Sequence, residues 1–139
     1  MRATLRARPA LVVVDAQEGF DDPSWGPTNN PACDDNIARL VTAWSEHGLP
    51  LVYVRHDSAM PGSPLHPSRP GNRLRPHLRA TPDLLVSKQV NSSFHGTRPP
   101  RLSATTRHGV FAEVVTTDTL LEALAGTPSG TGGASAGQE

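Results

Sequence analysis

The stretch Ala10-Leu-Val-Val-Val-Asp15 decides how this sequence folds. It is a continuous aliphatic run, mostly β-branched, and a carboxylate closes it. Such a run is typical of a parallel strand buried on both faces, where polar and apolar residues no longer alternate. The sequence therefore predicts a first strand here, with polar side chains at its carboxyl end.

The same pattern recurs in Leu51-Val-Tyr-Val-Arg55, which predicts a second strand. A helix is expected between the two strands, because four apolar residues follow helical spacing: Ile37, Leu40, Val41 and Trp44. Asp34 or Asp35 is the expected cap, and Gly48 with Pro50 ends the helix. The unit is long enough for a right-handed parallel crossover, so we expect an α/β fold with a parallel sheet.

The rest of the chain is less regular. The proline-rich residues 56–82 predict a long surface loop that covers part of the molecule, and Leu84-Leu-Val-Ser-Lys88 predicts a third strand. Beyond Thr97 the sequence predicts a short helix over residues 102–109, a last strand over residues 111–115, and a helix through Leu124 that Thr117 or Asp118 caps. Residues 1–125 form one domain, and residues 126–139 form a disordered Gly/Ser/Thr/Ala tail.

The composition narrows the classes of partner. Thirteen basic and thirteen acidic side chains give a net charge of zero, which argues against nucleic acid and anionic membranes and favours a small molecule or a protein. Arginines are frequent between residues 69 and 107, but no aromatic residues alternate with them, so solvated loop arginines are the preferred interpretation. The apolar run before Asp15 is too short for a membrane span or a signal core, and the single Cys33 fits a cytoplasmic location.

Asp15 and Lys88 each lie at the carboxyl end of a predicted parallel strand, where open α/β sheets bind their ligands. If both strands flank the second one, their backbones are about 10 Å apart, which a lysine side chain spans in large part. A salt-bridged pair is therefore feasible. The alternative is an aspartate that caps the next turn and a solvated lysine.

Four blocks of sequence resemble, in order and spacing, the isochorismatase-like cysteine hydrolases: Val13–Phe20, Asn30–Cys33, Val54–Ser58 and Ser87–Phe94. The resemblance covers residues 9–97. It implies a six-stranded parallel sheet in the order 3-2-1-4-5-6 between helical layers, and an Asp–Lys–Cys triad that hydrolyses amides or related carbonyl compounds. In this chain the aspartate is Asp15 and the lysine is Lys88.

The family's cysteine lies in a Gly-x-x-Thr-x-x-Cys pattern after the fourth strand, and this sequence contains no such pattern. The resemblance thus indicates that the segment from strand four to strand five is skipped, which predicts a three-layer fold reduced to about four strands, with the last strand beside the first. Cys33 lies where the pattern assigns no catalysis, so we interpret it as a packing or incidental thiol.

Further site residues follow from position. Gln17, Phe20 and Phe94 are expected to line the substrate pocket, although each could equally be a packing residue. His56 is expected to orient the loop or to border the pocket. Some relatives bind metal after the second strand, but His56, Asp57 and His66 lack a compact Asp-x-His unit. We expect no metal and no cofactor.

The resemblance implies hydrolysis of a C–N bond, or of a vinyl ether that an acid such as Asp15 can protonate without a cysteine. The missing cysteine predicts impaired or absent turnover. The alternative is a non-catalytic protein that acts as an interaction or oligomerisation module, because the skipped strand would leave the edge at Val12 and Val14 open to a second copy.

Overall fold

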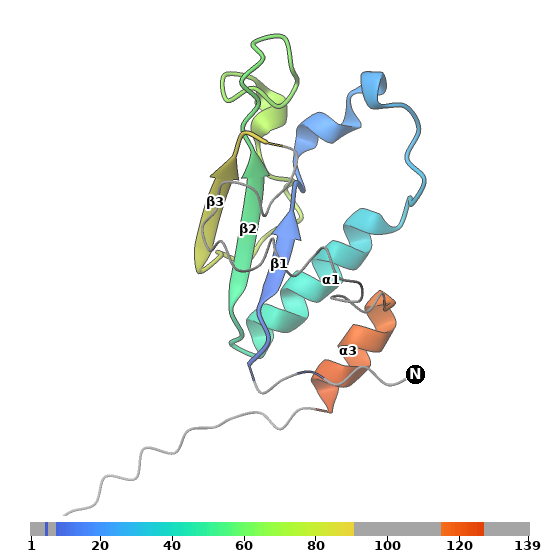
Figure 1. Cartoon of the computed structure of the whole chain (residues 1–139). Helices are drawn as coiled ribbons and strands as arrows, with labels where there is room; N and C mark the ends of the chain where they lie inside the picture. The colour runs from blue at the N-terminus through green and yellow to red at the C-terminus, as the bar shows by residue number, and fades with distance from the viewer. Residues whose placement is uncertain (1–4, 6–7, 91–114, 127–139) are drawn as a thin grey trace, which may run out of the picture.

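The computed structural model describes residue 5, residues 8–90 and residues 115–126. Three strands in this part form a parallel sheet in the order β1-β2-β3: β1 (Leu11–Val14), β2 (Leu51–His56) and β3 (Leu84–Lys88) (Figure 1). The predicted α/β fold class and the three predicted strands are confirmed. The aliphatic residues of β1 and β2 make these strands, since β-branched side chains pack well on a pleated surface.

The register brings the carboxyl ends of the strands to one edge of the sheet. Val14 pairs with Val54, and His56 pairs with Lys88 at the end of β3. The ladder continues past β1, because the Asp15 backbone N–H donates to the Val54 carbonyl at 2.8 Å. The residues that follow each strand therefore lie next to one another.

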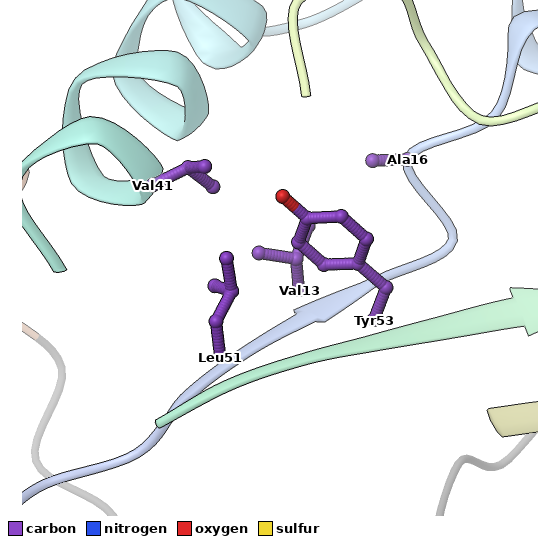
Figure 2. Close-up of a cluster of buried hydrophobic side chains, with 5 residues drawn as sticks. All are labelled: Val13, Ala16, Val41, Leu51 and Tyr53. Carbon is purple, nitrogen blue, oxygen red and sulfur yellow. The ribbon is translucent and has the colours of Figure 1, made fainter. Parts of the chain in front are cut away.

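Helix α1 (Cys33–Glu46) covers one face of the sheet. Its Val41 packs in a buried cluster with side chains from β1, β2 and the turn after β1. The cluster comprises Val13, Ala16, Val41, Leu51 and Tyr53 (Figure 2). Each large aliphatic side chain buried here contributes about 1.5–3 kcal/mol. Gly48 ends the helix in the left-handed region at a φ of 60°, where a side chain would be strained.

Both predicted helix caps were wrong by one to three positions. Ala32 occupies the N-cap of α1 and makes no side-chain cap bond, while Asp34 lies inside the first turn. A turn closed by Cys33 N–H and the Asn30 carbonyl leads directly into the helix, so it starts before the aspartates. In α3 (Thr117–Ala125) the cap is Thr116, whose side chain accepts from Thr119 N–H.

Helix α3 packs beside α1, where Arg39 forms a salt bridge to Asp118 at 2.6 Å (Figure 1). The other face of the sheet carries exposed aliphatic residues in the described part of the chain: Val12, Val14 and Leu84. The predicted short helix over residues 102–109, the predicted last strand up to residue 114 and the tail from residue 127 lie outside the described residues. The expected fourth strand is therefore untested.

The loop after β2 folds over the carboxyl edge of the sheet. It contains a 3-10 turn, η3 (Pro70–Asn72), which lies against η1 (Glu18–Asp21), and a second short turn, η2 (Pro23–Trp25), follows η1. Leu74 in the loop pairs with Gln17 in an isolated antiparallel bridge. The predicted long loop thus covers the segment that follows Asp15. No helix in the described part of the chain has the length and apolar character needed to cross a membrane.

Candidate active site

Three side chains from the ends of the three strands meet at the carboxyl edge of the sheet. Lys88 Nζ lies 2.9 Å from Asp15 Oδ2 and 3.3 Å from His56 Nδ1. The salt-bridged pair that the strand pattern predicts is therefore present, with β2 between the two contributing strands. The catalytic role of the pair remains a prediction.

Asp15 adopts an unusual backbone conformation. Its φ is 57°, and it is the one residue other than glycine with a positive φ in the described part of the chain. Aspartate tolerates the left-handed region better than most residues, yet such a position still costs on the order of 1–3 kcal/mol and persists only when the surroundings fix it. The tight turn, in which Gln17 N–H donates to the Asp15 carbonyl at 2.8 Å, aims the carboxylate across the end of β2 at Lys88.

Lys88 is almost completely enclosed. Its side chain is 2% exposed, against 26% for that of Asp15. Besides Asp15 and His56, its ammonium group donates to the Val90 carbonyl at 3.3 Å. A buried ammonium is stable only when it is paired and hydrogen-bonded, so the position of Lys88 depends on this carboxylate.

The second carboxylate oxygen of Asp15 is chemically the most informative atom of the site. Asp15 Oδ1 is buried and has no hydrogen-bond partner among the described residues. Buried polar atoms nearly always have a partner, and an exception calls for an explanation such as a catalytic role. A carboxylate with one oxygen held by an ammonium group and the other unoccupied is arranged to accept or return a proton.

His56 completes the cluster. The ammonium group of Lys88 can only donate, so His56 Nδ1 accepts and the ring proton is assigned to Nε2. His56 was expected to orient the loop or to border the pocket, and the structure brings it into contact with Lys88.

The other expected pocket residues are distributed differently. Gln17 is fully buried, and its side-chain amide is bonded to main-chain groups of His56 and Asn72. Phe20 in η1 packs against Trp25, with the ring centroids 5.4 Å apart. Phe94 lies outside the described residues. The structure thus brings together Asp15, His56 and Lys88, and it places the Gln17 amide inside the protein.

The sequence did not predict the hydrogen-bonding roles of two residues near the site, one of which, Asp57, was considered only as a metal ligand. Asn72 is 6% exposed, and its side-chain amide donates to the His56 carbonyl and to Asp57 Oδ1. Asp57 also receives a bidentate contact from Arg55. Burial raises the pKa of Asp57, but hydrogen bonds from Asn72, Arg55 and Ser87 and the charge of Arg55 outweigh it and lower the pKa below its usual value. The proline-rich composition of the loop gave no signal for this network.

Cys33 is the only cysteine of the 139 residues, and it is exposed at the first position of α1. No group of three or more His, Cys, Asp or Glu side chains in the described ranges is arranged to hold a metal ion. The expectation that the protein uses no metal and no cofactor stays a prediction.

Comparison with known proteins identifies the family. The model of the isochorismatase domain matches residues 9–117. An uncharacterized isochorismatase family protein of Bacillus subtilis (strain 168), YrdC, is 35% identical over 94 residues, which are 67% of this chain and 50% of that protein.

Solved structures show the same fold. An isochorismatase-family structure from Chromobacterium violaceum ATCC 12472 has a TM-score of 0.63 and 41% identity, with 77% of this chain and 56% of that one covered. An isochorismatase from Pseudomonas putida KT2440 has a TM-score of 0.55 and 26% identity, with 77% and 53% covered. The chain thus spans about half the length of the relatives it matches.

Proposed function

The chain belongs to the isochorismatase family, and we propose that it keeps the family's Asp–Lys pair for proton transfer on a small molecule while cysteine-dependent turnover is impaired. The observation that carries this proposal is the contact between Lys88 Nζ and Asp15 Oδ2 at 2.9 Å, made by a lysine that is 2% exposed. A buried pair of this kind at the carboxyl edge of a parallel sheet lies where α/β proteins bind small ligands.

The impairment follows from the sequence. The Gly-x-x-Thr-x-x-Cys pattern, which the family resemblance places after the fourth strand, has no counterpart in the 139 residues. Cys33 is a poor substitute, because it is exposed at the start of α1, at a position to which the family pattern assigns no catalysis. Attack by a thiolate on an amide therefore lacks its nucleophile.

One type of hydrolysis needs no thiol. The acid form of Asp15 can give its proton to the terminal methylene carbon of a vinyl ether, which leaves a cation at the ether carbon. Water adds to that carbon and returns a proton to the Asp15 carboxylate. The hemiketal then breaks its C–O bond, and its hydroxyl proton passes to the departing oxygen, which gives a ketone and an alcohol. Asp15 Oδ1 supports this route, because it has no competing hydrogen bond among the described groups.

Three proteins test the proposal: the wild type, Asp15→Asn and Cys33→Ser. Each is incubated with a panel of amides and with isochorismate, which carries a vinyl ether. We expect amide hydrolysis at the uncatalysed rate in all three, and isochorismate cleavage that falls about 10²–10⁴-fold in Asp15→Asn and is unchanged in Cys33→Ser. Amide hydrolysis that Cys33→Ser abolishes would overturn the proposal, and so would equal isochorismate cleavage by the wild type and Asp15→Asn.

A second candidate function is an interaction module, and the edge of β1 favours it, because within the described ranges β1 pairs with β2 alone. A groove of about 250 Å³ runs between this strand and α1, and its lining is wholly aliphatic: Leu11, Val12, Val13, Val14, Ile37 and Leu40. Val12 is 49% exposed and Val14 42% exposed. An uncharged strand edge of this kind is open to pairing with another strand.

The partner proposed for this edge is a second copy of the chain. Size-exclusion chromatography with light scattering compares the wild type with Val14→Lys, in which a charge blocks the edge. A wild-type dimer that becomes monomeric in Val14→Lys supports the interaction module, whereas a catalytically active monomer opposes it.

We also propose a cytoplasmic location for the protein. This proposal rests on Cys33, which has no cysteine partner within the chain for a disulfide bond.

A further inference from the structure

We infer that Gln17 and Asn72 are positioning residues, whose side-chain amides hold the His56 main chain so that the His56 ring accepts a hydrogen bond from Lys88 and turns its Nε2–H toward the ligand. The part of this inference that concerns a ligand rests on the proposed function. The positioning itself does not.

Gln17 takes the place of a strand neighbour. The ladder between β1 and β2 ends where Asp15 N–H donates to the Val54 carbonyl, because the chain then turns away from the sheet. Beyond that point the Gln17 side chain continues the ladder: its Oε1 accepts from His56 N–H at 2.8 Å and its Nε2 donates to the His56 carbonyl at 3.0 Å. A primary amide can do this because it carries the same donor and acceptor groups as a peptide unit.

The second N–H of Gln17 links it to the loop after β2. It donates to the Asn72 carbonyl at 2.9 Å, so both donors of the amide are used. Gln17 is 0% exposed, and water cannot replace these bonds. The Gln17 side chain thereby links the turn after β1 to the end of β2 and to η3.

Asn72 holds the same peptide from the other side. Its Nδ2 lies 3.2 Å from the His56 carbonyl and 2.9 Å from both Asp57 Oδ1 and the Leu65 carbonyl. The carbonyl of His56 thus receives donors from two buried amides. A buried polar network of this kind makes the local structure more rigid.

The fixed peptide determines where the ring lies. His56 pairs with Lys88 across β2 and β3, so both side chains leave the sheet at the same level. With the main chain of His56 clamped, its Nδ1 lies 3.3 Å from Lys88 Nζ, and the ring proton is left on Nε2. The chemistry this donor recognises is a carbonyl or carboxylate oxygen of the ligand.

The test follows the ¹⁵N resonance of His56 Nδ1, which depends on whether the atom accepts a hydrogen bond. Lys88→Met supplies the reference without the lysine donor, and a His56→Gln spectrum assigns the signal. We expect the resonance in Asn72→Ala and in Gln17→Met to move from the wild-type position to that of Lys88→Met. If Gln17→Met does not fold, Asn72→Ala decides alone.

Two controls separate positioning from loss of stability. Tyr53→Phe removes another buried hydrogen bond, from the Tyr53 hydroxyl to the Ala80 carbonyl, and should leave the His56 resonance unchanged. The half-buried His66, whose Nδ1 contacts Ser68, should give the same signal in every variant.

A wild-type His56 resonance in folded Asn72→Ala would overturn the inference, as would an equal shift in Tyr53→Phe. The measurement needs no turnover, so an inactive protein refutes the proposed function without affecting this result. Conversely, a negative result here leaves the comparison of the wild type with Asp15→Asn intact.

Discussion

The ammonium group of Lys88 lies 2.9 Å from the carboxylate of Asp15, although 73 residues separate the two in the chain. Asp15 directly follows β1 and Lys88 ends β3, so the two side chains come from either side of β2 and meet across its carboxyl end. They are not equally enclosed, because the lysine side chain is 2% exposed and the aspartate side chain 26%. Because of this difference in burial, we expect replacement of the aspartate and replacement of the lysine to change the free energy of unfolding by different amounts.

Asp15→Asn should destabilise the protein more than Lys88→Met. The first change leaves a buried ammonium facing a neutral amide, which we expect to cost about 3 kcal/mol, near the lower end for breaking a buried pair because the Val90 carbonyl remains. The second leaves an unpaired carboxylate on a side chain that is 26% exposed, and we expect about 1 kcal/mol. Asparagine tolerates the positive φ of Asp15 as well as aspartate does, so backbone strain does not confuse the comparison.

Urea unfolding monitored by circular dichroism measures both free energies. Equal losses, or a larger loss in Lys88→Met, would contradict the claim that burial of the lysine makes the pair asymmetric.

Asp57 should make folding stability depend on acid pH. Its pKa is lowered in the folded protein, since the hydrogen bonds and the charge of Arg55 outweigh the opposing effect of burial. The unfolded chain therefore binds a proton at higher pH than the folded one. The stabilisation is complete above the unfolded pKa of about 3.9 and is lost as the pH falls through the folded pKa.

Unfolding free energies measured from neutral pH down to about pH 3 check this effect, with Asp57→Asn as the comparison. The variant should show a shallower loss of stability on acidification than the wild type. Parallel curves would mean that Asp57 does not contribute.

The strands were predictable because their signal is local. Leu84–Lys88 was predicted residue for residue, and β1 and β2 were predicted to within one residue at each end. A continuous aliphatic run next to a polar stop favours a strand. The expected burial of β1 on both faces was wrong, because Val12 is 49% and Val14 42% exposed. The meeting of Asp15 and Lys88 followed from the same strands, since parallel order fixes which ends share an edge.

The predictions that were wrong concern features that depend on contacts between residues far apart in the sequence. Asp34 has the chemistry of a helix cap, but the preceding turn starts α1 earlier and Arg75 binds the carboxylate at 3.1 Å. Gln17 contacts Asn72 across 55 residues, inside a loop without periodicity. The local sequence reveals neither Arg75 as the partner of Asp34 nor Asn72 as the partner of Gln17. For this reason Gln17, whose amide completes the strand ladder, was predicted to be a pocket residue.

Gly71 should be intolerant of a side chain. A Cβ atom at this position would lie 2.6 Å from the Pro64 carbonyl oxygen and 2.7 Å from the Gly19 Cα, and both are backbone atoms that cannot move independently. Gly71→Ala should therefore lower the free energy of unfolding by about 1–3 kcal/mol, as overpacking does elsewhere. It should also displace the loop that holds Asn72.

Gly62→Ala is the matched control, because a Cβ there meets nothing within 4 Å. Thermal unfolding should show it close to the wild type. A Gly71→Ala protein as stable as Gly62→Ala would show that η1 and η3 are not in close contact.

Two arginines that form salt bridges should differ in their contribution to stability. Arg75 makes two contacts to the Asp21 carboxylate at 2.8 and 2.9 Å, and its side chain is 15% exposed. Arg39 makes one bridge to Asp118, with side chains 50% and 72% exposed. An ion pair is stronger when the arginine makes two hydrogen bonds to the carboxylate and is partly buried, whereas solvent screens an exposed pair.

We expect Arg75→Ala to cost about 1–2 kcal/mol and Arg39→Ala less than about 0.5 kcal/mol. Urea unfolding at low salt and at about 1 M NaCl should separate them further, because salt screens exposed pairs more strongly than buried ones. The Arg75 difference should persist at high salt, since this residue ties η1 and the start of α1 to the loop over the site. Equal costs for the two variants would show that Arg75 behaves as a solvated loop arginine, as the sequence pattern alone suggested.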